Sequence, residues 1–306
     1  MSRIDTDEDP LERARLDKET EVEIFKAVRS PDAENPVMPV KLKPADMFNF
    51  SCHKGVSCWN QCCHDANITL TPMDILRLSR HLDMKPREFL AEYTVPDNWD
   101  RADLPVAKLK MSGDDGKGAC HFMNDDGCSV YEDRPATCRY YPLGLASIKP
   151  KGSDLKEDFF FLVKESHCKG HDEEKLQSVT QFHGEQGLVD YDQGNRGWID
   201  ILMKMASWQS IGGPGGKEIP TQTKQMFFLV STDVDGFRQF VLESKFLDTY
   251  EIDPQAVEII KTDDVMLLQL GFDWLQNVLF NDPTISMKEN IMQEATAKAR
   301  ENMGAT

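Results

Sequence analysis

Cysteine is absent from the sequence before Cys52 and after Cys168, although the chain has eight cysteines in all. The chain also lacks any run of about 18 apolar residues, the length that a membrane-spanning helix needs. Basic residues are few, since 35 Lys and Arg stand against 52 Asp and Glu, for a formal charge of -17. Such a chain repels nucleic-acid phosphates and anionic lipid heads. We therefore expect no nucleic-acid partner and no membrane partner.

The amino terminus, MSRIDTDEDPLERARLDKE, has neither the basic start nor the apolar core of a secretory signal. We therefore expect a cytoplasmic protein. In a reducing compartment, clustered cysteines indicate a metal or redox site rather than a disulfide framework. With 40% hydrophobic and 28% charged residues among 306, the chain is long enough to fold as more than one compact unit.

Composition divides the chain into three expected segments. Residues 1–46 are an acidic N-terminal extension, with a helix expected over 9–29, followed by a Pro-rich connector. Residues 47–187 carry every cysteine among short helices and strands, and residues 188–306 are rich in Trp, Phe, Leu and Met. The sequence therefore predicts an α+β fold, in which a small cysteine-rich metal-binding domain precedes a mostly helical C-terminal region.

Local patterns predict individual elements. Thr71, Pro72 and Asp74 are typical of a helix start, because Thr caps well, Pro suits the first position and Asp complements the helix dipole. Further helices are expected over 86–93, 172–183, 198–208, 234–246, 254–261, 265–280 and 286–302, and strands over 106–111, 143–148, 159–163 and 226–230. The segment IGGPGGKEIP predicts a loop, and it lacks the residues of a phosphate-binding loop.

The cysteines have the arrangement Cys52-x5-Cys58-x3-Cys62-Cys63, then Cys120-x7-Cys128-x9-Cys138, then Cys168. Thiolates are soft ligands that favour zinc, cuprous copper and iron–sulfur clusters, so we expect all eight to be metal ligands. Adjacent side chains diverge in helices and strands, which predicts that Cys62 and Cys63 serve different metals. Eight cysteines are enough either for two four-ligand sites or for one multinuclear centre. The spacing matches neither common ferredoxin pattern.

Histidines stand beside four of the cysteines and offer a second kind of ligand. Each can complete a metal site or orient a ligand from outside it, and each can equally be an ordinary surface or core residue. His64 is the strongest candidate, because the site must lie close to the Cys62–Cys63 turn, whereas His171 is weaker. The other three are His53, His121 and His167.

Two arginines flank Cys138 in the sequence. Arg134 and Arg139 can offset thiolate charge or donate hydrogen bonds to sulfur, so we expect both to support the bound cofactor from outside its ligands. The alternative is that they are surface arginines bonded to Glu132 and Asp133.

The passages CHKGVSCWNQCC, ITLTPMDILRLSRHL, GACHFMNDDGCSVYEDRPATCRYYPLG and SHCKG closely resemble the YkgJ-type cysteine-cluster family. The resemblance covers about residues 48–171, and the elements occur in the same order. It implies a CxxCxxCC domain that chelates zinc or iron. This sequence widens the compact cysteine motif of the family, because five residues separate Cys52 from Cys58 and three separate Cys58 from Cys62.

The leading hypothesis is a cytoplasmic protein that chelates zinc or iron, with an iron–sulfur centre as one form of the cofactor. In one alternative the metal only stabilises a small domain, while the acidic surface and the Trp-rich helices meet a protein partner. In another, the centre belongs to an enzyme that modifies a protein, by analogy with the cysteine-rich region of flagellin lysine N-methylases. Metal storage or delivery is a third. The sequence does not choose among these.

Overall fold

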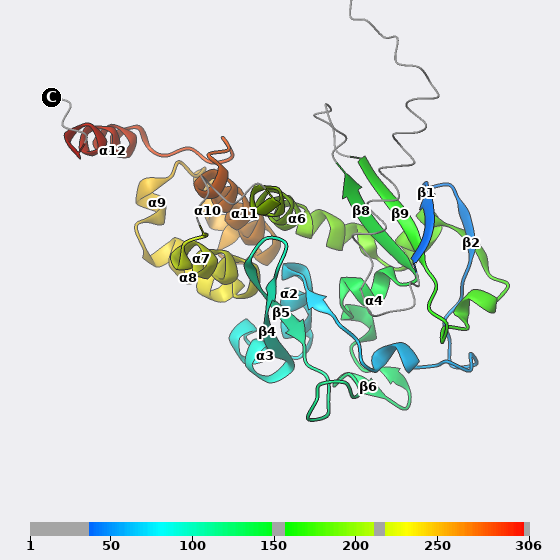
Figure 1. The fold of residues 1–306 in the computed structure, drawn as a ribbon. Coiled ribbons are helices and arrows are strands. Elements are labelled where there is room, and N and C mark those ends of the chain that lie inside the picture. The colour runs from blue at the N-terminus through cyan, green and yellow to red at the C-terminus, as the bar shows by residue number, and fades with distance from the viewer. Residues whose placement is uncertain (1–36, 149–156, 211–217, 303–306) are drawn as a thin grey trace, which may run out of the picture. The chain divides into compact units, whose positions relative to one another are not determined.

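The computed structural model describes residues 37–148, 157–210 and 218–302, which form two compact units (Figure 1). These units, called unit 1 and unit 2, are each built from several separate stretches of sequence, so the chain passes between them several times. The expected helix over 9–29 and most of the expected loop at 211–217 lie outside the described residues. The units comprise 1–64, 125–127 and 137–188 for unit 1, and 65–124, 128–136 and 189–306 for unit 2.

Small antiparallel sheets organise unit 1. The strand β9 (Glu157–Val163) lies between β1 (Val37–Leu42) and β8 (Leu143–Ile148), which confirms the expected strands over 143–148 and 159–163. A second pair joins β2 (Met47–Asn49) to β10 (Leu176–Ser178). The buried core beside these strands consists of Phe48, Phe50, Leu143, Val179 and Phe182.

The helices of unit 1 are short, and one expected helix is partly wrong. The segment predicted as a helix over 172–183 forms β10 first, and α5 (Val179–Glu185) begins only afterwards. Ser178 sets this boundary, because its side chain accepts from the backbone N–H of Gln181 and caps the helix. The remaining short elements are η1 (Gln61–Cys63), η3 (Gly170–Asp172) and α4 (Ala136–Tyr140), whose first residue belongs to unit 2.

Unit 2 opens with a small sheet and two helices that match the predictions. The strand β5 (Leu104–Leu109) lies between β3 (Thr69–Leu70) and β4 (Thr94–Trp99). The helix α2 (Pro72–His81) starts where expected, because Thr71 and Asp74 form a reciprocal capping box. The second expected helix is α3 (Pro86–Tyr93). The strand β5 begins and ends two residues before the expected 106–111.

Helices make up the described C-terminal part of unit 2, as expected, and they bury a large apolar core. The predicted strand over 226–230 is wrong, because these residues lie in α7, where Phe227 and Val230 are fully buried three residues apart on one face. No helix in the described part of the chain is long and apolar enough to cross a bilayer. The helices are α6 (Leu188–Ser210), α7 (Thr221–Thr232), α8 (Val234–Glu243), α9 (Phe246–Thr249), α10 (Pro254–Ile260), α11 (Asp264–Phe280) and α12 (Glu289–Asn302).

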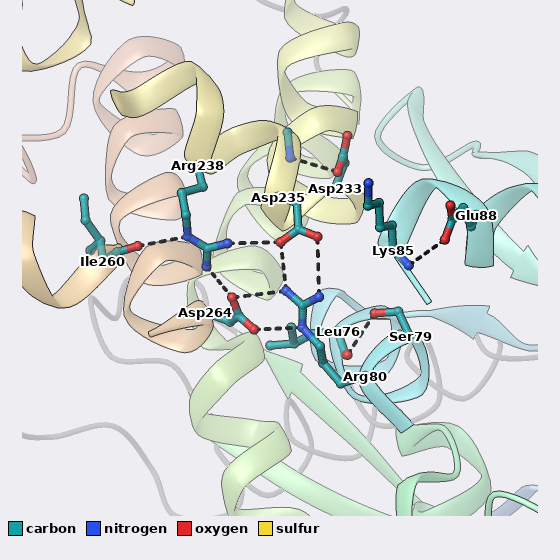
Figure 2. Close-up of polar contacts among 11 residues, drawn as sticks. Leu76, Ser79, Arg80, Lys85, Glu88, Asp233, Asp235, Arg238, Ile260 and Asp264 are labelled. Carbon is teal, nitrogen blue, oxygen red and sulfur yellow. Dashed lines mark hydrogen bonds and ion pairs between the residues drawn. The ribbon is translucent and has the colours of Figure 1, made fainter. Parts of the chain in front are cut away.

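Four charged side chains form a ring of ion pairs in unit 2 (Figure 2). Arg80 of α2 donates from Nη2 to Asp235 at 2.8 Å and from Nε to Asp264 at 3.1 Å. Arg238 of α8 contacts the same two carboxylates and also donates to the Ile260 carbonyl oxygen. The ring therefore joins α2, which belongs to the cysteine-bearing part of the sequence, to the C-terminal helices α8 and α11.

Asp235 gives this ring a dependence on pH. Burial alone would raise the pKa of Asp235, but hydrogen bonds and charge from Arg80 and Arg238 outweigh burial and hold it below its usual value. Such a carboxyl stabilises the fold above its unfolded pKa of about 3.9, and the contribution is lost as pH falls through the folded pKa. We expect Asp235→Asn to lower the free energy of unfolding at neutral pH. The loss should be no more than about 1 kcal/mol, because the ring is partly exposed.

The measurement is the thermal midpoint of both proteins at a series of pH values. The gap between wild type and Asp235→Asn should be constant near neutral pH and shrink steadily below about pH 4. Asp126→Asn is a matched control, because Asp126 pairs with Lys54 at 2.6 Å but is 90% exposed, and should show no gap. A gap of constant size down to pH 2 would show that packing, not charge, accounts for the Asp235 effect.

Candidate metal centre

The structure places all eight cysteines within described residues, and none of them forms a disulfide. Six belong to unit 1 and two belong to unit 2. The two in unit 2, Cys120 and Cys128, are half-buried and pack against an apolar core that includes Phe122 and Val130. The six in unit 1 are Cys52, Cys58, Cys62, Cys63, Cys138 and Cys168.

Cys58 and Cys168 form the first close pair of thiols in unit 1. Their thiols act on one another although 109 residues separate them in sequence. The backbone N–H of Lys169 donates to Cys58 Sγ at 3.1 Å, and the backbone N–H of Gly170 acts on the Cys168 thiol to lower its pKa. Burial raises the pKa of Cys168, and the neighbouring Cys58 raises it further. Two sulfur atoms therefore share one turn whose amide groups point at them.

Close packing fixes the position of this turn. The backbone N–H of Ser51 donates to the Gly170 carbonyl oxygen at 3.0 Å, which places the residue before Cys52 against the turn. A Cβ atom at Gly170 would lie 2.7 Å from the Phe50 ring and 2.9 Å from the Ser51 carbonyl oxygen. Only glycine fits there without displacing its neighbours, so this position holds the amide donors close to Phe50 and Ser51.

Cys62 and Cys63 form the second pair of thiols. They end the short helix η1, which follows Asn60 in a left-handed conformation with φ 66°. The Cys63 side chain hydrogen-bonds Cys62 and lowers the pKa of Cys62 to about 7, although burial and Glu165 oppose this. The two side chains meet in this turn instead of diverging as in a longer helix or strand. Their assignment to different metals stays a prediction.

Glu165 and Tyr141 lie close to the two thiol pairs. The Glu165 carboxylate raises the pKa of Cys62 and also that of Tyr141, so it is close to both groups. The Tyr141 hydroxyl is enclosed, and burial followed by the nearby Cys168 raises its pKa. In unit 1 the Glu165 carboxylate therefore acts on one thiol of the second pair, and the Tyr141 hydroxyl is a neighbour of Cys168 in the first pair.

Two histidines near this turn have structural partners on their rings. His53 contacts Glu173 through Nε2 at 3.2 Å, while its Nδ1 accepts from the Gly55 backbone N–H at 3.1 Å. His171 Nε2 contacts the Val163 carbonyl oxygen at 3.0 Å, and its ring packs on Phe50. Both rings therefore have a structural role.

His64 contacts the backbone through one of its two ring nitrogens. Its Nδ1 lies 3.2 Å from the Asn60 carbonyl oxygen, a contact in which Nδ1–H donates and Nε2 carries the lone pair. A backbone carbonyl on one nitrogen commonly orients a metal-binding imidazole. Of the others, His167 lies 3.6 Å from Glu165, and His121 in unit 2 packs against the ring of Tyr93. His64 therefore remains the strongest histidine candidate.

The two arginines near Cys138 are buried, so the surface position that the alternative gave them is wrong. Arg134 Nη1 donates to the Tyr131 carbonyl oxygen at 2.8 Å, and its guanidinium lies over the Tyr131 ring. Arg139 Nη1 donates to the Gln186 carbonyl oxygen at 2.8 Å. These bonds tie each guanidinium to backbone, and support of the cofactor by either arginine stays a prediction.

The donor set of unit 1 fits zinc or iron in its chemistry. Among the described residues, no three His, Cys, Asp or Glu side chains lie close enough together to hold a metal ion as they stand. The thiols instead meet in pairs, and a backbone amide already donates to the sulfur of Cys58. Soft sulfur ligands with amide donors around them are typical of zinc and iron sites. Bringing the two pairs together would complete four ligands.

Comparison with known families supports this chemistry. Residues 51–172 match the family model CxxCxxCC, described as "Putative zinc- or iron-chelating domain". The matched range contains all eight cysteines and confirms the resemblance to a CxxCxxCC domain. It covers less than half of the chain, so it describes a domain and not the C-terminal helices. No curated protein and no solved structure matches the chain.

Proposed function

We propose that this protein binds zinc or iron at a centre built from the two thiol pairs of unit 1. Its ligands are Cys58, Cys62, Cys63 and Cys168, so in this proposal Cys62 and Cys63 bind one centre, in place of the expectation that they serve different metals. The observation that supports this most directly is the turn at Cys168, where the backbone N–H of Lys169 donates to Cys58 Sγ at 3.1 Å and the backbone N–H of Gly170 favours the charged form of Cys168 by lowering its pKa. Amide donors stabilise negative charge on sulfur, and metal-bound sulfur carries that charge.

The other four cysteines enter the proposal as further ligands, with no grouping assigned. Cys52 and Cys138 belong to unit 1, and Cys120 and Cys128 belong to unit 2. His64 is a candidate to replace one of the thiolates, through Nε2. A bound metal would hold the loop from Cys58 to Cys63 against the turn at Cys168 and stabilise unit 1. Reduced thiols of this kind suit a reducing compartment such as the cytoplasm.

Anaerobic purification tests the proposal, followed by elemental analysis and an absorption spectrum of the same sample. We expect at least one equivalent of zinc or iron per chain after extensive dialysis. Zinc with no visible absorption indicates a closed thiolate site, whereas iron with acid-labile sulfide and broad visible absorption indicates an iron–sulfur centre. Reconstitution with each metal excludes substitution during expression. A chain that retains neither metal, and takes up neither on reconstitution, would overturn the proposal.

A further inference from the structure

The packing of unit 1 does not explain why the hydroxyl of Tyr141 is buried. Its oxygen is shielded from solvent and makes no hydrogen bond of normal geometry within the described residues. The ring is fixed, because it packs edge-on against Phe50 at 6.0 Å and His171 at 6.4 Å between centroids. A buried polar group without a partner costs about 1 to 3 kcal/mol. Phenylalanine would fill the same space without this cost.

The sulfur of Cys168 is the acceptor that explains this hydroxyl. Tyr141 and Cys168 pack against the same apolar core, which includes Phe50, and the Cys168 thiol and the Glu165 carboxylate both act on the Tyr141 hydroxyl. A neutral thiol is a weak acceptor, whereas a metal-bound sulfur carries negative charge and accepts strongly. A phenol keeps its proton at neutral pH and can donate it in a hydrogen bond. The Cys168 sulfur therefore becomes a strong acceptor for the Tyr141 hydroxyl only when the site holds metal.

We propose that Tyr141 is a positioning residue of the metal centre, whose hydroxyl donates a hydrogen bond to the metal-bound sulfur of Cys168. This inference rests on the proposed function. The bond orients the Cys168 sulfur and withdraws part of its charge, in the way that partners outside the ligand shell tune metal sites. The buried hydroxyl thus costs stability in the metal-free protein and contributes stability to the metal-bound protein.

Tyr141→Phe in the full chain tests this inference, with zinc for affinity and cobalt(II) as a spectroscopic probe. We expect the affinity for metal to fall about 10- to 100-fold and the sulfur-to-cobalt charge-transfer bands to shift. The thermal midpoint of the metal-free variant should equal or exceed that of wild type, since the unpaired hydroxyl is gone. A purely structural role would lower this midpoint and leave the bands unmoved.

Tyr140→Phe is the matched control, because Tyr140 is the adjacent tyrosine and packs against the same core. It should keep the affinity and the spectrum of wild type. Fluorotyrosine at position 141 keeps the fold and strengthens the donor, so it should shift the cobalt bands opposite to Tyr141→Phe. If wild type binds metal but the cobalt bands move neither in Tyr141→Phe nor with fluorotyrosine at position 141, the role of Tyr141 is overturned and the proposed function stands. If wild type binds no metal, the proposed function itself fails.

Discussion

Replacing both Cys58 and Cys168 by serine should remove the metal from unit 1. The two thiols share one turn, and serine hydroxyls are poor ligands for zinc and iron at neutral pH. A structural zinc site supplies on the order of 10 to 16 kcal/mol in small zinc-binding peptides, so losing two ligands should have a large effect. We expect at least one metal equivalent to be lost and the thermal midpoint of the metal-loaded protein to fall.

Elemental analysis measures the metal content of each variant, and calorimetry measures its thermal midpoint. Ser166→Ala is the matched control, because Ser166 lies two residues before Cys168 and its replacement leaves every thiol in place. In Cys120→Ser the centre of unit 1 should keep its metal, because none of its four proposed ligands lies in unit 2. Any metal lost from that variant is metal bound by the further ligands. Full metal content in the double variant would exclude Cys58 and Cys168 as ligands.

Local sequence signals predicted those elements whose boundaries depend on their own residues. Thr71, Pro72 and Asp74 predicted α2 because the capping box is complete within four residues. The run at 226–230 was misleading, because a short apolar stretch fits a strand and a buried helix equally well. Its helical state depends on the core that surrounds Phe227, which includes Phe237 and Phe272.

The pairing of the thiols could not be predicted from the sequence for a related reason. Cys58 and Cys168 meet only because the turn at Gly170 packs against Phe50 and Ser51, a contact that spans more than 100 residues. The meeting of Cys62 with Cys63 depends on the left-handed Asn60. The cysteine motif therefore predicts the kind of site, while contacts distant in sequence decide which sulfurs are neighbours.

Asp74→Ala should destabilise unit 2 more than the loss of a helix cap alone. Asp74 is fully buried, and its carboxylate accepts from the backbone N–H of Thr71 at 2.8 Å and of Ala136 at 2.7 Å. Alanine removes both acceptors and leaves two amide groups without these partners. Each lost partner should lower the free energy of unfolding by about 1 to 3 kcal/mol. The bond to Ala136 also holds the first residue of α4, the helix that carries Cys138.

We therefore expect Asp74→Ala to cost roughly 3 kcal/mol and to lower the thermal midpoint by about 6 to 12 °C. Thr71→Ser is the matched control, because serine still accepts from the Asp74 backbone N–H and should stay close to wild type. Calorimetry of the metal-free proteins isolates the fold from the metal. An Asp74→Ala midpoint within a degree of wild type would mean that water replaces both bonds, so that Asp74 would not be what fixes the start of α4.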